Sequence, residues 1–276
     1  MSTYQAIVLA LVQAITEFFP ISSSAHLILM PYLMRWKDQG LPFDIATNTG
    51  TLLAIMVYFR RDLLRLWAGW VSSLKTGSGA GASASGASYG RLAWAILIAT
   101  VPAAVAGPLV RGFVATAGRS PLLIACTSIF YGLLLGWADR IGTRTRQVET
   151  LTLAEGLIIG AAQALALVPG TSRSGVTITA GLFLGFDRPA AARFSFLLAV
   201  PVGILVALDD LIQIAVGRIP SRDLLPMAIG LVVSALAGYL VIAALLAWLR
   251  RQSLMIFAVY KLLLGVVIFA VFWWFR

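Results

Sequence analysis

The first polar cluster of this 276-residue chain lies near its N-terminus. Gln13 and Glu17 are four positions apart, so a helix would place both on one face. That face leads into Pro20 and the serines at 22–24, and His26, the only histidine, follows. A carboxylate binds Mg²⁺ or Ca²⁺ through oxygen, an imidazole exchanges a proton near neutral pH, and a hydroxyl among the three serines can act as nucleophile.

The second cluster is the segment Pro169-Gly170-Thr171-Ser172-Arg173-Ser174-Gly175. A turn flanked by Gly170 and Gly175 can point backbone N–H groups at one anion, and the dipole of the helix that follows adds to the attraction. Arg173 supplies a fork of donors that matches phosphate oxygens. Together the two clusters hold the cation ligand, the acid–base group and the positive charge that phosphoryl transfer requires.

Each of these residues also has a purely structural interpretation. Serines and threonines commonly hydrogen-bond between membrane helices, His26 could be a packing residue, and Glu17 with Arg173 could form a structural ion pair. The functional interpretation depends on the combination, because ionisable groups are costly inside a membrane and here they gather at two places.

Composition predicts the kind of chain that carries these clusters. Hydrophobic residues make up 60% and charged residues 12%, with a mean hydropathy of +0.92, which predicts an all-α polytopic membrane protein in a single domain, residues 1–276. The net charge of +10 is scattered between apolar segments, so a nucleic-acid partner is not expected. The single cysteine, Cys126, lies in an apolar run and is expected in the core.

Six apolar segments are long enough to be transmembrane helices, at about 43–59, 92–110, 121–138, 194–216, 224–249 and 253–275. Two further segments, 4–34 and 153–186, are apolar but broken midway by the polar clusters. Broken backbone is tolerated at membrane depth only where protein buries it or a wet cavity lines it. We therefore predict six transmembrane helices plus two re-entrant helix hairpins.

The two broken segments align at an offset of 150 without a gap, which places Gln13 on Gln163 and Ser22 on Ser172. Three crossings follow each one, so the second copy would be inverted in the bilayer. Repeat 1 spans about 4–138 and repeat 2 about 153–275. Interrupted segments in both halves of an inverted repeat indicate a binding site near the midplane.

The connecting segments supply an orientation. Loops at 60–91, 139–149, 187–193 and 250–251 carry 12 Lys and Arg against 6 in the opposite loops, which places the former in the cytoplasm and both termini outside. Residues 77–88 are expected to form a mobile low-complexity linker, and Arg60 to Leu74 an amphipathic helix at the interface. Asp209 and Asp210 are expected to end a crossing, and Lys261 to snorkel.

At the two clusters the sequence resembles the BacA family of undecaprenyl-diphosphate phosphatases, which recycle the lipid carrier of bacterial cell-wall synthesis. The first family motif, (E/Q)-x-x-x-E before a Pro, a hydroxyl run and His, matches Gln13 to His26. The second, P-G-x-S-R-S-x-x-T, matches Pro169 to Thr177 in full. The resemblance covers nearly the whole chain.

The resemblance implies a role for each matching position. Glu17 and Gln13 would bind the cation or orient water, Ser23 would be the nucleophile and His26 its acid–base partner. The diphosphate would be held by Arg173 together with Ser22, Ser24, Gly170, Ser172, Ser174 and Thr177. Two positions depart from the common pattern: Gln13 stands where Glu is frequent, which removes a negative charge, and Ala25 replaces a frequent Gly.

The expected activity is therefore cation-dependent hydrolysis of undecaprenyl diphosphate, a phosphoric anhydride, in the bacterial inner membrane. The expected partners are the polyprenyl diphosphate substrate and membrane lipids, and a homo-oligomer stays open. A transporter or flippase of a phosphorylated polyprenyl lipid is the alternative, because an inverted repeat would serve it equally. Attack by a serine hydroxyl and attack by an activated water both stay open. A soluble-type acid phosphatase fits poorly, because that family needs two histidines and this chain has one.

Overall fold

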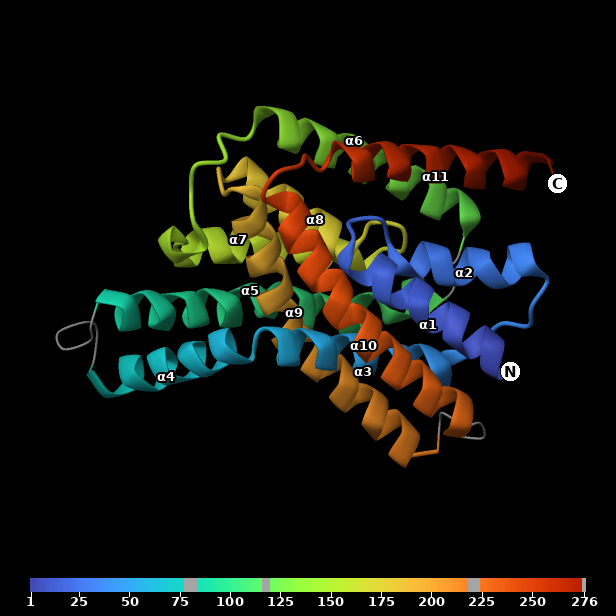
Figure 1. Cartoon of the computed structure of the whole chain (residues 1–276), viewed down its shortest axis with the longest axis horizontal. Coiled ribbons are helices and arrows are strands. Elements are labelled where there is room, and N and C mark those ends of the chain that lie inside the picture. Colours follow the sequence, from blue (N-terminus) through green and yellow to red (C-terminus); the bar gives the residue numbers. More distant parts are fainter. Residues whose placement is uncertain (77–83, 116–119, 218–223, 275–276) are drawn as a thin grey trace.

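The computed structural model describes residues 1–76, 84–115, 120–217 and 224–274. Within these ranges the regular structure is helical, with eleven α-helices and two short 3₁₀ helices (Figure 1). Five of the described helices are long and apolar enough to cross a membrane, over residues 88–110, 121–141, 188–215, 224–249 and 255–273. This confirms the predicted all-α membrane class.

The predicted crossing at 43–59 is helix α3 (Leu41–Tyr58), which is not among those five. Asp44 and Asn48 lie in its first half, together with Thr47 and Thr49, and these lower its hydropathy. The expectation of six uniformly apolar crossings is therefore not met over the described residues. The polar half of α3 faces the cavity described below.

Both broken segments are helix pairs, as predicted. The four helices are α1 (Thr3–Phe18), α2 (Ser23–Met34), α7 (Leu153–Ala164) and α8 (Arg173–Phe183). A 3₁₀ turn, Leu165–Leu167, follows α7. Ser22 and Ser172, at the predicted offset of 150, precede α2 and α8 and have φ values of 76° and 73°. Left-handed backbone is unusual for serine, so its occurrence at both equivalent positions supports the sequence duplication.

Apart from α4, the remaining long helices make contacts that recur in both halves of the chain. The full set is α4 (Arg60–Thr76), α5 (Ala84–Ala115), α6 (Pro121–Ile141), α9 (Arg188–Ala215), α10 (Leu224–Leu249) and α11 (Met255–Trp274). Helix α10 contacts α1 and α3, and α5 contacts α7 and α9 in the same way. Helices α6 and α11 lie side by side along one edge of the molecule (Figure 1). Exchanging the two halves preserves these contacts, as expected of a repeat.

Helix α9 is fixed at its start by ion pairs. Arg188 contacts Asp139 of α6 through two nitrogens, at 2.6 and 3.0 Å. Arg193 donates to Asp62 of α4 and, at 2.7 Å, to Glu149. Because these pairs are partly buried, losing one partner would be costly. They hold the first turns of α9, which support the site.

Several smaller expectations need correction. Lys261 does not snorkel: it is fully buried on α11. Helix α9 continues to Ala215, so Asp209 and Asp210 lie inside it. Cys126 is exposed on α6, where an apolar thiol can face lipid as readily as core. The expected linker lies outside the described residues over 77–83, and its last residues, 84–88, are the start of α5.

The amphipathic helix expected after Arg60 is present as α4, which packs along α5. Leu64 and Trp67 are largely exposed on it, whereas Leu66 is buried. Exposed apolar side chains beside polar ones are typical of a helix at a membrane interface. Its place in the bilayer stays a prediction.

Candidate active site

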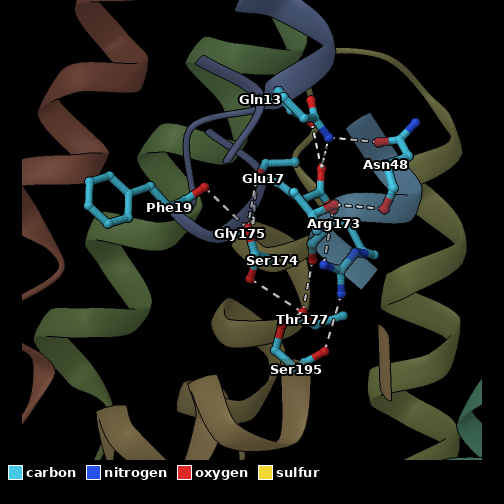
Figure 2. A network of polar contacts seen from close by, with 12 residues as sticks. Gln13, Glu17, Phe19, Asn48, Arg173, Ser174, Gly175, Thr177 and Ser195 are labelled. Carbon is cyan, nitrogen blue, oxygen red and sulfur yellow. Dashed lines mark hydrogen bonds and ion pairs between the residues drawn. The ribbon is translucent and has the colours of Figure 1, made fainter. Parts of the chain in front are cut away.

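The two hairpin turns meet near the centre of the molecule (Figure 1). Ser174 donates from its hydroxyl to the carbonyl oxygen of Phe19 at 3.2 Å, which ties the start of α8 to the end of α1 (Figure 2). The hydroxyl of Ser172 accepts from the backbone N–H of Gly175 at 3.1 Å and caps α8. Arg173 is the first residue of α8, so this cap fixes where its side chain begins.

An ion pair joins the hairpins. Arg173 Nη2 donates to Oε1 of Glu17 at 3.1 Å, and Arg173 Nη1 donates to the carbonyl oxygen of Ser195 on α9 at 3.2 Å. The side chains of Glu17 and Arg173 are 20% and 18% exposed, so both still reach open space. A ligand that enters this space can contact the carboxylate and the guanidinium together.

The second carboxylate oxygen of Glu17 is also engaged. Ser23 donates from its hydroxyl to Oε2 at 2.7 Å, and Gln13 Nε2 lies 3.4 Å from the same atom. Gln13 Nε2 also donates to Oδ1 of Asn48 on α3 at 2.7 Å (Figure 2). Glu17 is therefore the acceptor for the Ser23 proton, held in place from α1, α3 and α8.

The carboxylate is positioned by packing as well as by hydrogen bonds. Phe18, next to Glu17, is fully buried and meets Phe196 of α9 edge to face at 5.6 Å. Close packing of side chains is what holds helices together in a membrane, because lipid is as apolar as the side chains themselves. The end of α1 is thus held against α9, the same helix whose Ser195 carbonyl holds Arg173.

A cavity of about 200 Å³ opens beside the ion pair. The polar residues that line it are Glu17, Asn48, Thr49, Thr51, Arg173 and Asp210. The rest of its wall is apolar and comes mainly from α9, including Gly203. A polar end with a carboxylate and a guanidinium next to an apolar wall suits a charged head group that carries a hydrocarbon tail.

His26 does not line this cavity. Its Nδ1 lies 2.7 Å from the carbonyl oxygen of Ser22, and its Nε2 lies 2.6 Å from the hydroxyl of Tyr260 on α11. The structure therefore brings Glu17, Ser23, Gln13 and Arg173 together and turns His26 towards α11. Its acid–base role stays a prediction.

The other predicted phosphate ligands make bonds within the protein. Ser22 and Ser24 lie 3.1 Å apart through their hydroxyls, and so, at 3.3 Å, do Ser172 and Ser174. Thr177 donates to the carbonyl oxygen of Arg173 at 2.8 Å, and its hydroxyl lies 2.7 Å from that of Ser195. These bonds shape the two turns. Binding of the diphosphate by these five hydroxyls stays a prediction.

Gly170, also a predicted ligand, packs against α6. Its φ is +88°, and an added Cβ would lie 2.1 Å from Thr127 Oγ1 and 2.8 Å from the carbonyl oxygen of Ile124. Glycine is required there by both the backbone angle and the close approach. The structure thus gives a packing reason for this residue and does not place it on the cavity wall.

The donor set for a cation is small. Within the described ranges no three His, Cys, Asp or Glu side chains form a metal-binding group. Glu17 and Asp210 line one cavity, and a Mg²⁺ site needs only one or two carboxylates when substrate phosphates supply further oxygens. The residues fit a cation that binds with its substrate. Gln13 presents its amide nitrogen to Glu17, so its predicted ligand role would need the amide oxygen instead.

Three residues of this site were missed in the sequence. Asn48 could have been found, because a carboxamide inside an apolar segment is costly in a membrane. The sequence predicts Asp210 at the end of a crossing, whereas the residue lies inside α9 and lines the cavity. Ser195 contributes its backbone carbonyl to Arg173, a role that leaves no trace in the residue type.

Comparison with known proteins agrees with the resemblance found in the motifs. Residues 6–267 match the family model described as "Bacitracin resistance protein BacA". A Magnetococcus marinus protein named "Undecaprenyl-diphosphatase" is 51% identical over 271 residues, covering 98% of this chain and 99% of that protein. "Undecaprenyl-diphosphatase 2" of Stutzerimonas stutzeri is 46% identical over 275 residues, covering 99% of each chain. A Moorella thermoacetica "Undecaprenyl-diphosphatase" is 45% identical over 273 residues, again covering 99% of each.

Proposed function

We infer that this chain, which belongs to the BacA family, is a membrane-embedded phosphatase. It hydrolyses undecaprenyl diphosphate to undecaprenyl phosphate and inorganic phosphate. The relatives that carry this name align over nearly their whole length, so no part of the site is missing from the comparison. The reaction serves cell-wall synthesis by recycling its lipid carrier.

One observation carries the assignment of the site. Glu17, which accepts the Ser23 proton, also contacts Arg173 from the other hairpin. Phosphoryl transfer needs a base beside the nucleophile and a positive charge beside the phosphate, and these three side chains supply both. The cavity that Glu17 and Arg173 line has an apolar wall along which the prenyl chain can leave towards the membrane.

The chemistry follows from these contacts. The nucleophile attacks the terminal phosphorus, a new P–O bond forms, and the bond from that phosphorus to the bridging oxygen breaks. The bridging oxygen leaves with undecaprenyl phosphate. Glu17 takes the proton of the Ser23 hydroxyl, or of a water that Ser23 and Glu17 hold. In the first case water later hydrolyses the phosphoserine, and in the second, inorganic phosphate forms in one step.

Arg173 stabilises the charge of the reacting phosphate. Its guanidinium is held by Glu17 on one side and by the Ser195 carbonyl on the other, so it needs little reorganisation when the substrate binds. A divalent cation, Mg²⁺ or Ca²⁺, would be held by Glu17 with Asp210 nearby and would neutralise phosphate oxygens. Gln13 and Asn48 then keep the carboxylate oriented.

The membrane arrangement belongs to the same proposal. The hairpins α1–α2 and α7–α8 enter from opposite faces, the loops richer in Lys and Arg are cytoplasmic, and the membrane is the bacterial inner membrane. The matched packing of α10 on α1 and α5 on α7 supports the inverted repeat. Helix α3 packs against α1, α9 and α10 and lines the cavity with Asn48, Thr49 and Thr51.

Phosphate release by the purified protein tests the activity. The protein in detergent is given undecaprenyl diphosphate with Mg²⁺ or Ca²⁺, and inorganic phosphate is measured over time. We expect release that stops when the cation is chelated. Movement of intact lipid diphosphate across liposomes without release of phosphate would instead favour a flippase.

A further inference from the structure

Lys261 is a buried cation with no role so far. It lies in the first half of α11 and is 0% exposed, and a buried ammonium is costly unless its N–H groups are hydrogen-bonded. Its Nζ donates to the carbonyl oxygens of Gly170 at 3.0 Å and Thr171 at 2.7 Å. In the described part of the chain no carboxylate lies within ion-pair distance of it.

The two carbonyls that Lys261 contacts belong to the turn before Arg173. Left-handed φ values at Gly170 and Ser172 bend the chain there, so its carbonyls lack helical partners. Unpaired carbonyls are costly at membrane depth. The hydroxyl of Thr127, on α6, donates to the carbonyl oxygen of Pro169, the residue before Gly170, at 2.8 Å. Side chains of α6 and α11 thus hold three consecutive carbonyls of this turn.

The residue before Lys261 holds the other hairpin. The Tyr260 hydroxyl lies 2.6 Å from Nε2 of His26, and the two rings stack at 5.7 Å with 11° between their planes. The Ser22 carbonyl can only accept, so Nδ1 of the neutral imidazole carries the proton and Nε2 accepts from Tyr260. Tyr260 therefore reaches the turn before Ser23 through His26.

We propose that Tyr260 and Lys261 are positioning residues that set the two hairpin turns relative to each other, Lys261 through the Gly170 and Thr171 carbonyls and Tyr260 through His26. This rests on the proposed phosphatase function. Each hairpin brings one half of the site: Ser23 follows the turn that Tyr260 holds, and Arg173 follows the turn that Lys261 holds. Neither positioning residue lines the cavity, so both act through the turns.

The proposal predicts different kinetic effects for the two residues. Lys261→Met keeps a long unbranched side chain but removes the N–H donors to the Gly170 and Thr171 carbonyls. The turn before Arg173 then loses its support, and the Arg173 side chain shifts. We expect KM for undecaprenyl diphosphate to rise at least about tenfold, with a smaller change in kcat. Tyr260→Phe frees the imidazole and the start of α2, so kcat should fall at least about tenfold while KM stays within about twofold.

Matched controls separate positioning from general damage. Lys75→Met removes an exposed lysine of α4, and Tyr239→Phe removes a hydroxyl of α10 for which no hydrogen bond is seen in the described part of the chain. Both should keep wild-type kinetics. Lys261→Gln retains a hydrogen-bond donor, so its KM should lie between those of the wild type and Lys261→Met. If Lys261→Met does not fold, Thr127→Val tests the same turn through the Pro169 carbonyl and should also raise KM.

The outcomes are distinguishable. Wild-type kinetics for Lys261→Met and Tyr260→Phe would overturn the positioning role, and so would an equal fall of kcat in both with KM unchanged, which indicates a smaller active fraction. A wild-type protein that releases no phosphate would count against the proposed function instead. The predicted split between KM and kcat supports the positioning role.

Discussion

Glu17 and Arg173 are 156 residues apart in the sequence, and their side chains meet at 3.1 Å. One comes from the end of α1 and the other from the first residue of α8, so the contact joins the two broken segments. An ion pair left partly open to a cavity is poorly suited to stability alone. It is well placed to exchange part of its contacts for a phosphate.

Ser23→Ala tests the nucleophile. Because Ser23 is the hydroxyl that donates to Glu17, its loss removes either the attacking oxygen or the group that holds water, and we expect phosphate release to fall about 10²–10⁴-fold. Ser73→Ala, on α4 and away from the cavity wall, is the control and should keep full activity. Acid quenching during turnover then separates the mechanisms, since a phosphate trapped on Ser23 shows covalent attack. Full activity of Ser23→Ala would remove Ser23 from the mechanism.

Gln13→Glu tests how the cation is held. The change places a second carboxylate close to Glu17, because Gln13 Nε2 now lies 3.4 Å from Oε2 of that residue. Repulsion should lower the melting temperature without cation, and Mg²⁺ or Ca²⁺ should restore it. We expect half-maximal phosphate release at a lower cation concentration than in the wild type. An unchanged cation requirement together with an unchanged melting temperature would contradict a cation at Glu17.

Gly50→Val tests the packing of α3, which carries Asn48. A Cβ at Gly50 would lie 2.0 Å from Ser234 Oγ and 2.4 Å from the carbonyl oxygen of Leu231 on α10, so the helices would have to separate. We expect a lower melting temperature in detergent and loss of activity. Gly107→Val is the matched control, because a Cβ there meets nothing within 4 Å. Equal melting temperatures for the two variants would argue against this close packing.

The sequence predicted much of this arrangement because its signals are local. Apolar length identifies the spanning helices, and the breaks at Ser22 and Ser172 are visible as polar runs in apolar segments. The offset of 150 relates the breaks to each other without any coordinates. The pairing of Glu17 with Arg173 then follows from placing two breaks at one depth.

What the sequence did not predict depends on the direction of side chains. The contact of His26 with Tyr260 is one example, while its role as acid–base partner of the nucleophile stays a prediction. The sequence predicts that Lys261 reaches the interface, and this is wrong. The carbonyl oxygens to which Lys261 donates belong to a turn 90 residues away, which its position in α11 does not reveal. The polar residue type of Asn48 is visible in the sequence, but its contact with Gln13 is not. Rotamers and long-range contacts of this kind are not encoded in spacing.

The central claim is that Glu17 and Arg173 act as one unit on the diphosphate, and a double-mutant cycle of phosphate release tests it most directly. Glu17→Gln and Arg173→Lys should each lower kcat/KM by about 10²-fold or more, with Arg251→Lys, an exposed arginine, as an unaffected control. The double variant should lose much less than the product of the two single effects, because residues that act together are not additive. Wild-type phosphate release from either single variant, or two losses that simply multiply, would contradict the account.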